Sequence, residues 1–164
     1  MKTDAKTIKL ILATIFIAQL AYFYPSLPES VAIHFNAAGL ADNFTSRQNY
    51  FLLELALLAF AFFFAKINSA FINVLPVSLI NMPHREYWLA DERRAATLKI
   101  LENYFGWLSA AMLAFFIALN QLTIDANFRD PVRLSDGFWL VLAGFLVFIA
   151  FWMYKFITRF NKLT

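Results

Sequence analysis

The chain has 164 residues, of which 61% are hydrophobic and 20 are phenylalanine, more apolar material than a soluble core of this size uses. The net charge of +3 does not indicate nucleic-acid binding, because the basic residues flank apolar stretches and do not form a stripe. The absence of cysteine excludes disulfide bonds and thiolate chemistry.

Four apolar stretches lie at residues 8–24, 50–68, 100–122 and 138–160, each near the ~20 residues with which an α-helix crosses a ~30 Å hydrocarbon layer. We therefore expect an all-α integral membrane protein, with residues 1–164 forming a single domain of four transmembrane helices. The first stretch follows a basic start, as in a signal peptide, but lacks the small residue that a cleavage site needs two positions before Ala21. It should stay attached as a helix.

The loop between the first two stretches is expected to be short and ordered. Over residues 30–36, Val31, Ile33 and Phe35 alternate with smaller or polar residues, which is the period of a small extended segment. Such a segment would make a compact lid over the helix ends. Local signals mark its borders: helix-breaking Pro25 and Pro28, a turn at Gly39, and a capping box at 45–48 (Thr-Ser-Arg-Gln).

Polar residues of this loop and of the second stretch form a candidate outer site: His34, Asn36, Gly39, Asp42, Arg47 and Glu54. The spacings of 8 and 12 residues between His34, Asp42 and Glu54 match no strong metal template, so we expect no metal. His34 and Asn36 should hydrogen-bond the loop onto the helix ends. Glu54 should face the bundle, because a charge facing lipid is costly. There it would either pair with a neighbour or form a ligand or proton site; the candidate partners are Arg47, His34, Asn120 and Gln121.

Apolar sequence continues beyond the second stretch. A fifth span over residues 67–80 is one interpretation, but Asn73 and Pro76 disfavour a helix exposed to lipid. We expect residues 69–80 to form a cytoplasmic interfacial segment or a shallow re-entrant one.

A third helix should follow Pro83, with Asp91 as its cap and Glu92 in its first turn. It should run through Leu122, some ~31 residues or roughly 46 Å. Its start and the preceding residues form a candidate inner site: Asn81, Pro83, His84, Tyr87, Trp88, Arg93 and Arg94. Its basic residues suit anionic lipid head groups. The alternative is that this block docks a membrane-protein partner or a second copy of the chain.

The basic residues divide unequally between the two sides of a four-span model. Eleven of the 14 lie on the side of the N-terminus: Lys2, Lys6, Lys9, Lys66, Arg85, Arg93, Arg94, Lys99, Lys155, Arg159 and Lys162. Three lie on the other: Arg47, Arg129 and Arg133. A fifth span would change the division to 6 against 8. The positive-inside rule therefore predicts four spans with both termini in the cytoplasm.

Aromatic residues at both predicted borders indicate anchoring in the head-group layers. Those at the outer border are Tyr22, Phe23, Tyr24, Tyr50, Phe138 and Trp139. Those at the inner border are Tyr87, Trp88, Tyr104, Trp107, Trp152 and Tyr154.

Two blocks resemble a known family. Residues 27–36 (LPESVAIHFN), followed by Gly39, Asp42 and Arg47, resemble the signature of the bacterial membrane domain-of-unknown-function 1648 family, the N-terminal domain type of SdpI-like immunity proteins. The chain departs from this pattern at Ala32, where the family usually has Pro, and at Arg47, where it usually has Lys. Residues 81–89 (NMPHREYWL) are similar to the Asn-x-Pro…Tyr-Trp block of the same family.

This resemblance implies a small SdpI-like protein of the bacterial inner membrane that senses or protects against an agent at the outer face. The chain contains no nucleophile elbow, metalloprotease helix or phosphate loop, so we expect neither catalytic residues nor a cofactor. Two alternatives are an accessory subunit of a larger membrane complex and a small transporter or intramembrane enzyme centred on Glu54.

Overall fold

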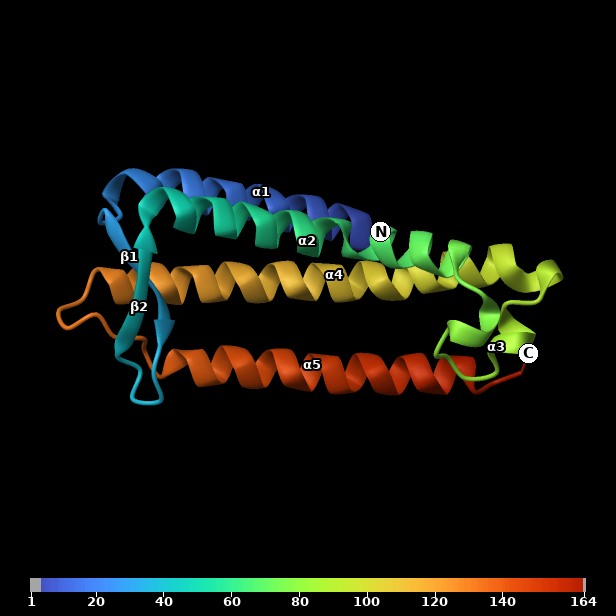
Figure 1. Ribbon diagram of the computed structural model, residues 1–164. Helices are drawn as coiled ribbons and strands as arrows, with labels where there is room; N and C mark the ends of the chain where they lie inside the picture. The colour runs from blue at the N-terminus through green and yellow to red at the C-terminus, as the bar shows by residue number, and fades with distance from the viewer. Residues whose placement is uncertain (1–3, 164) are drawn as a thin grey trace.

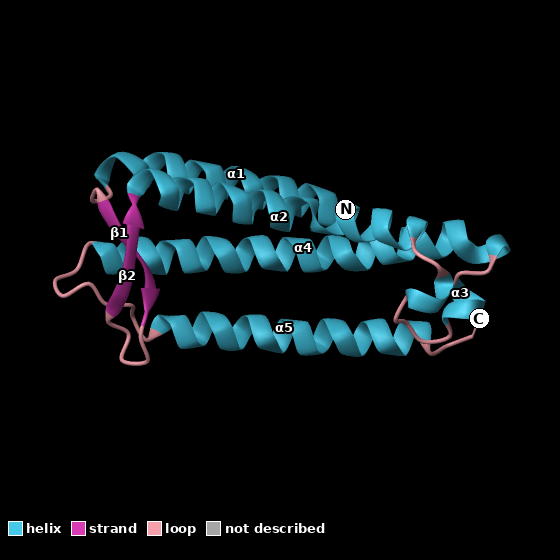
Figure 2. Cartoon of the chain, viewed as in Figure 1, coloured by secondary structure: helices cyan, strands magenta, loops and turns pink. Residues whose placement is uncertain are grey.

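The computed structural model describes residues 4–163; Lys2, one of the basic residues counted above, lies outside this range. Residues 4–163 form four long helices, a β-hairpin at one end of the bundle and short helices that include α3 at the other (Figures 1 and 2). The long helices are α1 (Ala5–Phe23), α2 (Arg47–Val74), α4 (Asp91–Asn127) and α5 (Gly137–Phe160). Each belongs to a segment long and apolar enough to cross a membrane, which confirms the four predicted spans. The chain is a multi-pass membrane protein.

Helix α4 is the centre of the bundle. It contacts α1 and α2 on one side and α5 on the other (Figure 1). A buried apolar cluster joins α1, α2 and α4: Phe16, Leu20, Leu58, Ala61 and Leu113. Within it the Ser109 hydroxyl donates a hydrogen bond to the Ala61 carbonyl, a contact that small residues permit by letting two backbones approach.

Helix α5 packs on α4 chiefly through aromatic rings. Phe145 stacks on Phe115 with ring centroids 4.3 Å apart, and Trp152 Nε1 donates to the Tyr104 carbonyl at 2.8 Å. Among its residues only Phe160 is buried, so most of α5 presents apolar side chains outward. An apolar exterior of this kind is what a lipid-facing helix needs.

The loop after α1 and the short helix η1 (Tyr24–Ser26) forms an antiparallel hairpin of β1 (Ser30–Phe35) and β2 (Ala41–Ser46). Strand β1 falls within the stretch where alternation favoured an extended backbone. The predicted strict alternation is wrong, because Val31 and Ala32 are both buried while Ile33 is exposed. The register shifts between Ala32 and Phe35, and a shift of this kind redirects the side chains that follow.

The second helix is longer than predicted. Helix α2 continues to Val74, so the first six residues of the 69–80 segment belong to it, and a separate interfacial or re-entrant segment over that range is wrong. The Asn68 side chain donates to the Phe64 carbonyl at 2.8 Å, which satisfies the amide within the helix and allows the helix to continue. Pro76 and the short helix η2 (Val77–Leu79) then turn the chain.

Two predicted caps are also corrected. Helix α2 is capped by Ser46, whose Oγ accepts from the Asn49 amide at 3.2 Å, and not by Thr45 at the start of the proposed capping box. Helix α4 has Ala90 at its N-cap position without a side-chain cap, and Asp91 lies in the first turn. With 37 residues, α4 is about 55 Å long and extends past the predicted end at Leu122.

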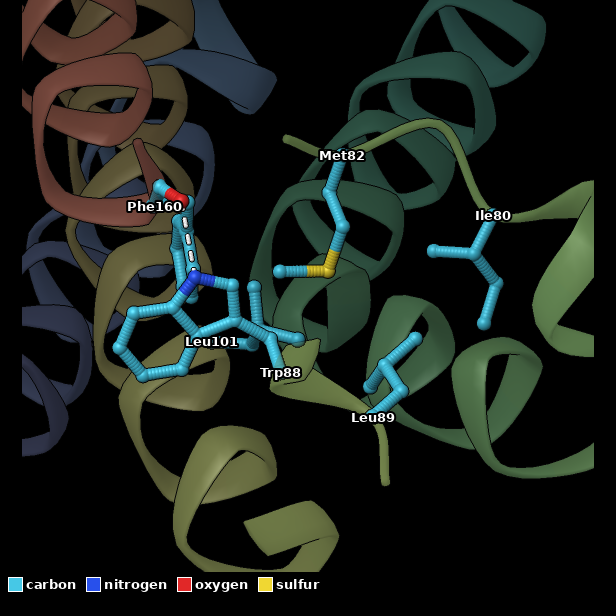
Figure 3. Packing of buried hydrophobic residues seen from close by; sticks show 6 residues of the cluster. All are labelled: Ile80, Met82, Trp88, Leu89, Leu101 and Phe160. Atoms are coloured by element: carbon cyan, nitrogen blue, oxygen red, sulfur yellow. Dashed lines mark hydrogen bonds between the residues drawn. The ribbon is translucent and has the colours of Figure 1, made fainter. Parts of the chain in front are cut away.

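An apolar cluster closes the end of the bundle opposite the hairpin. Its buried members are Ile80, Met82, Trp88, Leu89, Leu101 and Phe160, which Figure 3 shows gathered from α3 (Arg85–Trp88), α4, α5 and the loops between them. Trp88 Nε1 donates to the Phe160 carbonyl at 2.8 Å. The predicted exposure of Trp88 to lipid head groups or a partner is therefore wrong, as is that of Tyr50, because both side chains are buried.

Replacing Trp88 should destabilise the protein strongly. Its side chain is only 4% exposed, and Trp88→Ala should lower the free energy of unfolding by about 3–5 kcal/mol. Thermal unfolding in mild detergent measures the effect. Trp139, 63% exposed, is the matched control, and Trp139→Ala should change stability by about 0.5 kcal/mol or less. Equal effects of the two substitutions would contradict the packing described.

Candidate functional site at the hairpin end

The hairpin is fastened to the end of α4 by one asparagine. The Asn127 side chain accepts a hydrogen bond from the Ala32 amide at 2.7 Å and donates one to the Ala32 carbonyl at 3.1 Å. Its Nδ2 also donates to the Thr123 carbonyl at 2.9 Å, which fixes the rotamer. Asn127 and Ala32 are both buried, so these bonds are shielded from competing solvent. Asn127 was not among the predicted site residues, because it lies beyond the predicted end of the third helix.

Arg47 joins the end of α1 to the start of α2. Its Nη1 donates to the Leu27 carbonyl at 3.1 Å and to the Pro25 carbonyl at 3.3 Å, and its guanidinium lies 5.3 Å from the centre of the Tyr24 ring. These contacts satisfy carbonyls that the end of a helix leaves free. Arg47 is therefore engaged in the fold and forms no ion pair with Glu54.

The turn of the hairpin depends on Asn36 and Gly39. Asn36 Oδ1 accepts from the backbone amides of Ala38 at 2.9 Å and Leu40 at 3.1 Å. Gly39 has φ +76°, in the left-handed region that favours glycine, and a Cβ there would come within 3.2 Å of the Leu134 carbonyl oxygen. The Leu134 amide donates to the Gly39 carbonyl at 2.9 Å, so the turn is bonded to the loop before α5.

A groove of about 430 Å³ lies between this turn and the start of α5, and we call it the hairpin groove. Its walls are residues 33–39 of the hairpin and residues 133–136, 138 and 139. They combine charged groups, Arg133 and Asp136, with the rings of Phe138 and Trp139. The groove can therefore accept a ligand that presents both polar and apolar groups.

His34 lines the hairpin groove and pairs with Asp42 on the neighbouring strand. His34 Nδ1 lies 2.5 Å from Asp42 Oδ1, and the two side chains are 66% and 41% exposed. The prediction that His34 and Asn36 bond the loop onto the helix ends is wrong, because both make their bonds inside the hairpin. Unlike Gly39 and Arg47, which bond to segments outside the hairpin, the His34–Asp42 pair connects no second element to it.

Glu54 lies apart from the other outer candidates. It is 7% exposed and shares the buried face of α2 with Tyr50 and Leu58, which confirms that it faces the bundle. The expected ion pair is wrong: among residues 4–163, Glu54 has no salt-bridge or hydrogen-bond partner. The four candidate partners all bond to other groups.

A network of polar side chains crosses the bundle beneath the hairpin. The Tyr50 hydroxyl donates to Asn120 Oδ1, and Asn120 Nδ2 donates to Gln19 Oε1 at 2.7 Å. Gln19 Nε2 donates in turn to Gln121 Oε1 at 2.9 Å, and Gln121 Nε2 to Asp125 Oδ1 at 2.8 Å. The network joins α1, α2 and α4. Gln19 was not among the predicted site residues, and Tyr50 was predicted only as an anchor at the membrane border. Gln19, Asn120 and Gln121 nevertheless stand out in the sequence as amides within apolar stretches.

Most candidate residues at the α3 end of the bundle make contacts that stabilise the fold. Arg94 Nη2 donates to the Ile72 and Asn73 carbonyls at 2.9 and 3.2 Å, at the end of α2. Arg93 Nε donates to the Tyr87 carbonyl at 2.8 Å, and its guanidinium lies 3.9 Å from the Tyr87 ring centre. Asn81 and His84 are exposed and Pro83 is half-buried.

No group of three or more His, Asp or Glu side chains suited to a metal ion occurs in the described part of the chain.

Comparison with known families identifies one matching segment. Residues 10–65 match the model of a family described as domain of unknown function (DUF1648). The match runs from within α1 through the hairpin into α2, about a third of the chain, and supports a domain of this family there. The match does not include the inner candidate residues, which lie within residues 81–94, or the helices α4 and α5. No curated protein and no solved structure matches the chain.

Removal of the Asn127 side chain should loosen the hairpin. Asn127→Ala leaves the buried amide and carbonyl of Ala32 without partners, at a cost of about 1–3 kcal/mol. Thermal unfolding and hydrogen exchange over β1 measure the change. Asn43, an exposed asparagine on the same hairpin, provides the control, and Asn43→Ala should leave both measurements nearly unchanged. Unaltered exchange at Ala32 in Asn127→Ala would show that the hairpin is held by other contacts.

Proposed function

We propose that this protein is a small SdpI-like, non-enzymatic protein of the bacterial inner membrane that senses or protects against an agent at the hairpin side. The observation that supports this most directly is the exposed His34–Asp42 pair beside the hairpin groove. Asn36, Gly39 and Arg47 are occupied by structural bonds and Glu54 is buried, whereas this pair is exposed and available to a ligand. The family match includes the whole hairpin and so agrees with a role centred on it.

The properties of the hairpin favour recognition of an amphipathic agent. Leu40 and Phe44 are exposed on the same hairpin as the polar His34–Asp42 pair. Because the hairpin is bonded to α4 and to the loop before α5, binding to it costs little ordering of the backbone. An agent with both apolar and polar groups, arriving along the membrane surface, would find both kinds of contact there.

The proposed orientation places the hairpin outside and both termini in the cytoplasm. The three basic residues at the hairpin end are Arg47, Arg129 and Arg133, and the other described basic residues lie toward the opposite end of the helices. This distribution is the one that the positive-inside rule associates with a cytoplasmic α3 end.

Cysteine labelling can test this orientation, because the natural chain has no cysteine. Ala37, at the hairpin turn, and Ala95, on α4, are both exposed. In intact cells a membrane-impermeant maleimide should label Ala37→Cys and should label Ala95→Cys only after the membrane is opened. Labelling of both variants from the same side would contradict the proposed topology.

Protection or sensing can be tested by complementation in the native host. A strain that lacks the gene should grow poorly in medium conditioned by the parent strain, and the wild-type gene should restore growth. His34→Ala and Asp42→Ala should fail to restore it, while their thermal stability changes by about 1 kcal/mol or less, because the pair is exposed.

Asn43→Ala serves again as the matched control and should restore growth fully. Normal growth of the deletion strain, or full restoration by both variants of the pair, would refute the proposal. Loss of stability together with loss of growth would assign the pair a structural role.

A further inference from the structure

A second pocket, of about 430 Å³, lies where α1 begins against α2 and α4. Its charged lining consists of Lys6, Lys9, Lys66 and Lys99 together with Asp4 and Glu102, and we call it the lysine pocket. Four cations and two anions from three helices therefore meet around one opening. The excess of positive charge makes the pocket suitable for an anionic ligand.

The start of α1 indicates where the lysine pocket lies along the bundle. A Cβ added to Gly106 would come within 3.1 Å of the Ala5 side chain, so α1 begins at the level of Gly106. Helix α4 extends about 22 Å beyond that level toward α3, from Gly106 back to Asp91 (Figure 1). If the apolar length of α1 sets the bilayer position, its first residues lie at the membrane border. The lysines are then placed beside lipid phosphates.

The four lysine amines make no polar bond within the described part of the chain. Within residues 4–163, none of their amines forms a salt bridge or a hydrogen bond. Arg93 and Arg94, in contrast, donate to backbone carbonyls. Of the basic residues expected to meet lipid, Lys99 lines this pocket, and the amines of the pocket are available to an anionic group.

Neither acid of the pocket neutralises the lysines fully. Asp4 Oδ1 accepts from the Thr7 amide at 2.8 Å, and this bond holds the pKa of the Asp4 carboxyl below its usual range. Its carboxylate is thus engaged in capping α1. Lys9 and Lys66 line the pocket from α1 and α2 and repel each other as like charges, and Glu102 in the same lining offsets part of that repulsion. An anion between the two amines would relieve the remainder.

We propose that the lysine pocket binds the phosphate head group of an anionic phospholipid. Leu10 and Phe62 belong to the same pocket and supply an apolar surface next to the amines. Lys9 Nζ already lies over the Phe62 ring, 4.9 Å from its centre, at the junction of the charged and apolar surfaces. A lipid satisfies both surfaces at once, with its phosphate at the lysines and its acyl chains along the helices. Inorganic phosphate would satisfy only the first.

Native mass spectrometry of the full chain in mild detergent tests the proposal. Phosphatidylglycerol is titrated against phosphatidylcholine, and the bound fraction is followed for wild type and for Lys9→Gln/Lys66→Gln. We expect phosphatidylglycerol to bind more tightly than phosphatidylcholine. Its affinity should fall about five-fold for each lysine removed and roughly 25-fold for the pair.

Two controls separate lost charge from lost structure. Lys9→Arg/Lys66→Arg keeps both charges and should retain the affinity. Lys155→Gln/Lys162→Gln removes two exposed lysines outside the pocket and should also retain it. If the Gln pair fails to fold, the single variant Lys99→Gln, at an exposed position, should still show the five-fold loss.

Three results would overturn the proposal. The first is equal binding of the two lipids by wild type. The second is unchanged phosphatidylglycerol affinity in the Gln variants, or an equal loss in the Lys155/Lys162 pair. The third is a rise in thermal stability with inorganic phosphate alone that matches the rise with phosphatidylglycerol, because the site would then take free phosphate and not a lipid.

Discussion

Polar side chains in a lipid bilayer are stabilised by hydrogen bonds within the protein, and α4 takes part in most of the side-chain bonds that join one long helix to another here. Through Asn120 and Gln121, α4 bonds to the amide of Gln19 on α1, and through Asn120 also to the hydroxyl of Tyr50 on α2. At its end, Asn127 satisfies both backbone groups of Ala32. Helix α5, which has almost no polar side chains in its span, instead packs on α4 through aromatic rings.

At the hairpin, the residues whose bonds hold the fold together differ from the residues that are exposed to a ligand. Asn36 and Gly39 form the turn, and Arg47 satisfies the carbonyls after α1. The His34–Asp42 pair is exposed and joins only two strands that the backbone already pairs. The segment that matches the family model thus contains both residues that build the hairpin and residues that the hairpin exposes. The proposed recognition function rests on the second group.

Hydrophobic length predicted the four spans, because a membrane requires apolar runs of a defined size. Contacts between distant segments could not be predicted in this way. Asn127 and Ala32 are 95 residues apart, and Trp88 is buried in part by Phe160 of α5, 72 residues away. The length of α2 was underestimated because Asn68 satisfies its own amide within the helix. Strand β2 lacks apolar alternation, and its pairing follows from the turn.

The central claim is that the hairpin is a rigid platform fixed to α4. Electron paramagnetic resonance can measure the distance between spin labels at Ala37, on the turn, and Phe128, just after α4, since both positions are exposed and the chain has no other cysteine. A fixed hairpin should give one narrow distance distribution in lipid nanodiscs, and Asn127→Ala should broaden it. A broad or multiple distribution in the otherwise unaltered protein would contradict the account.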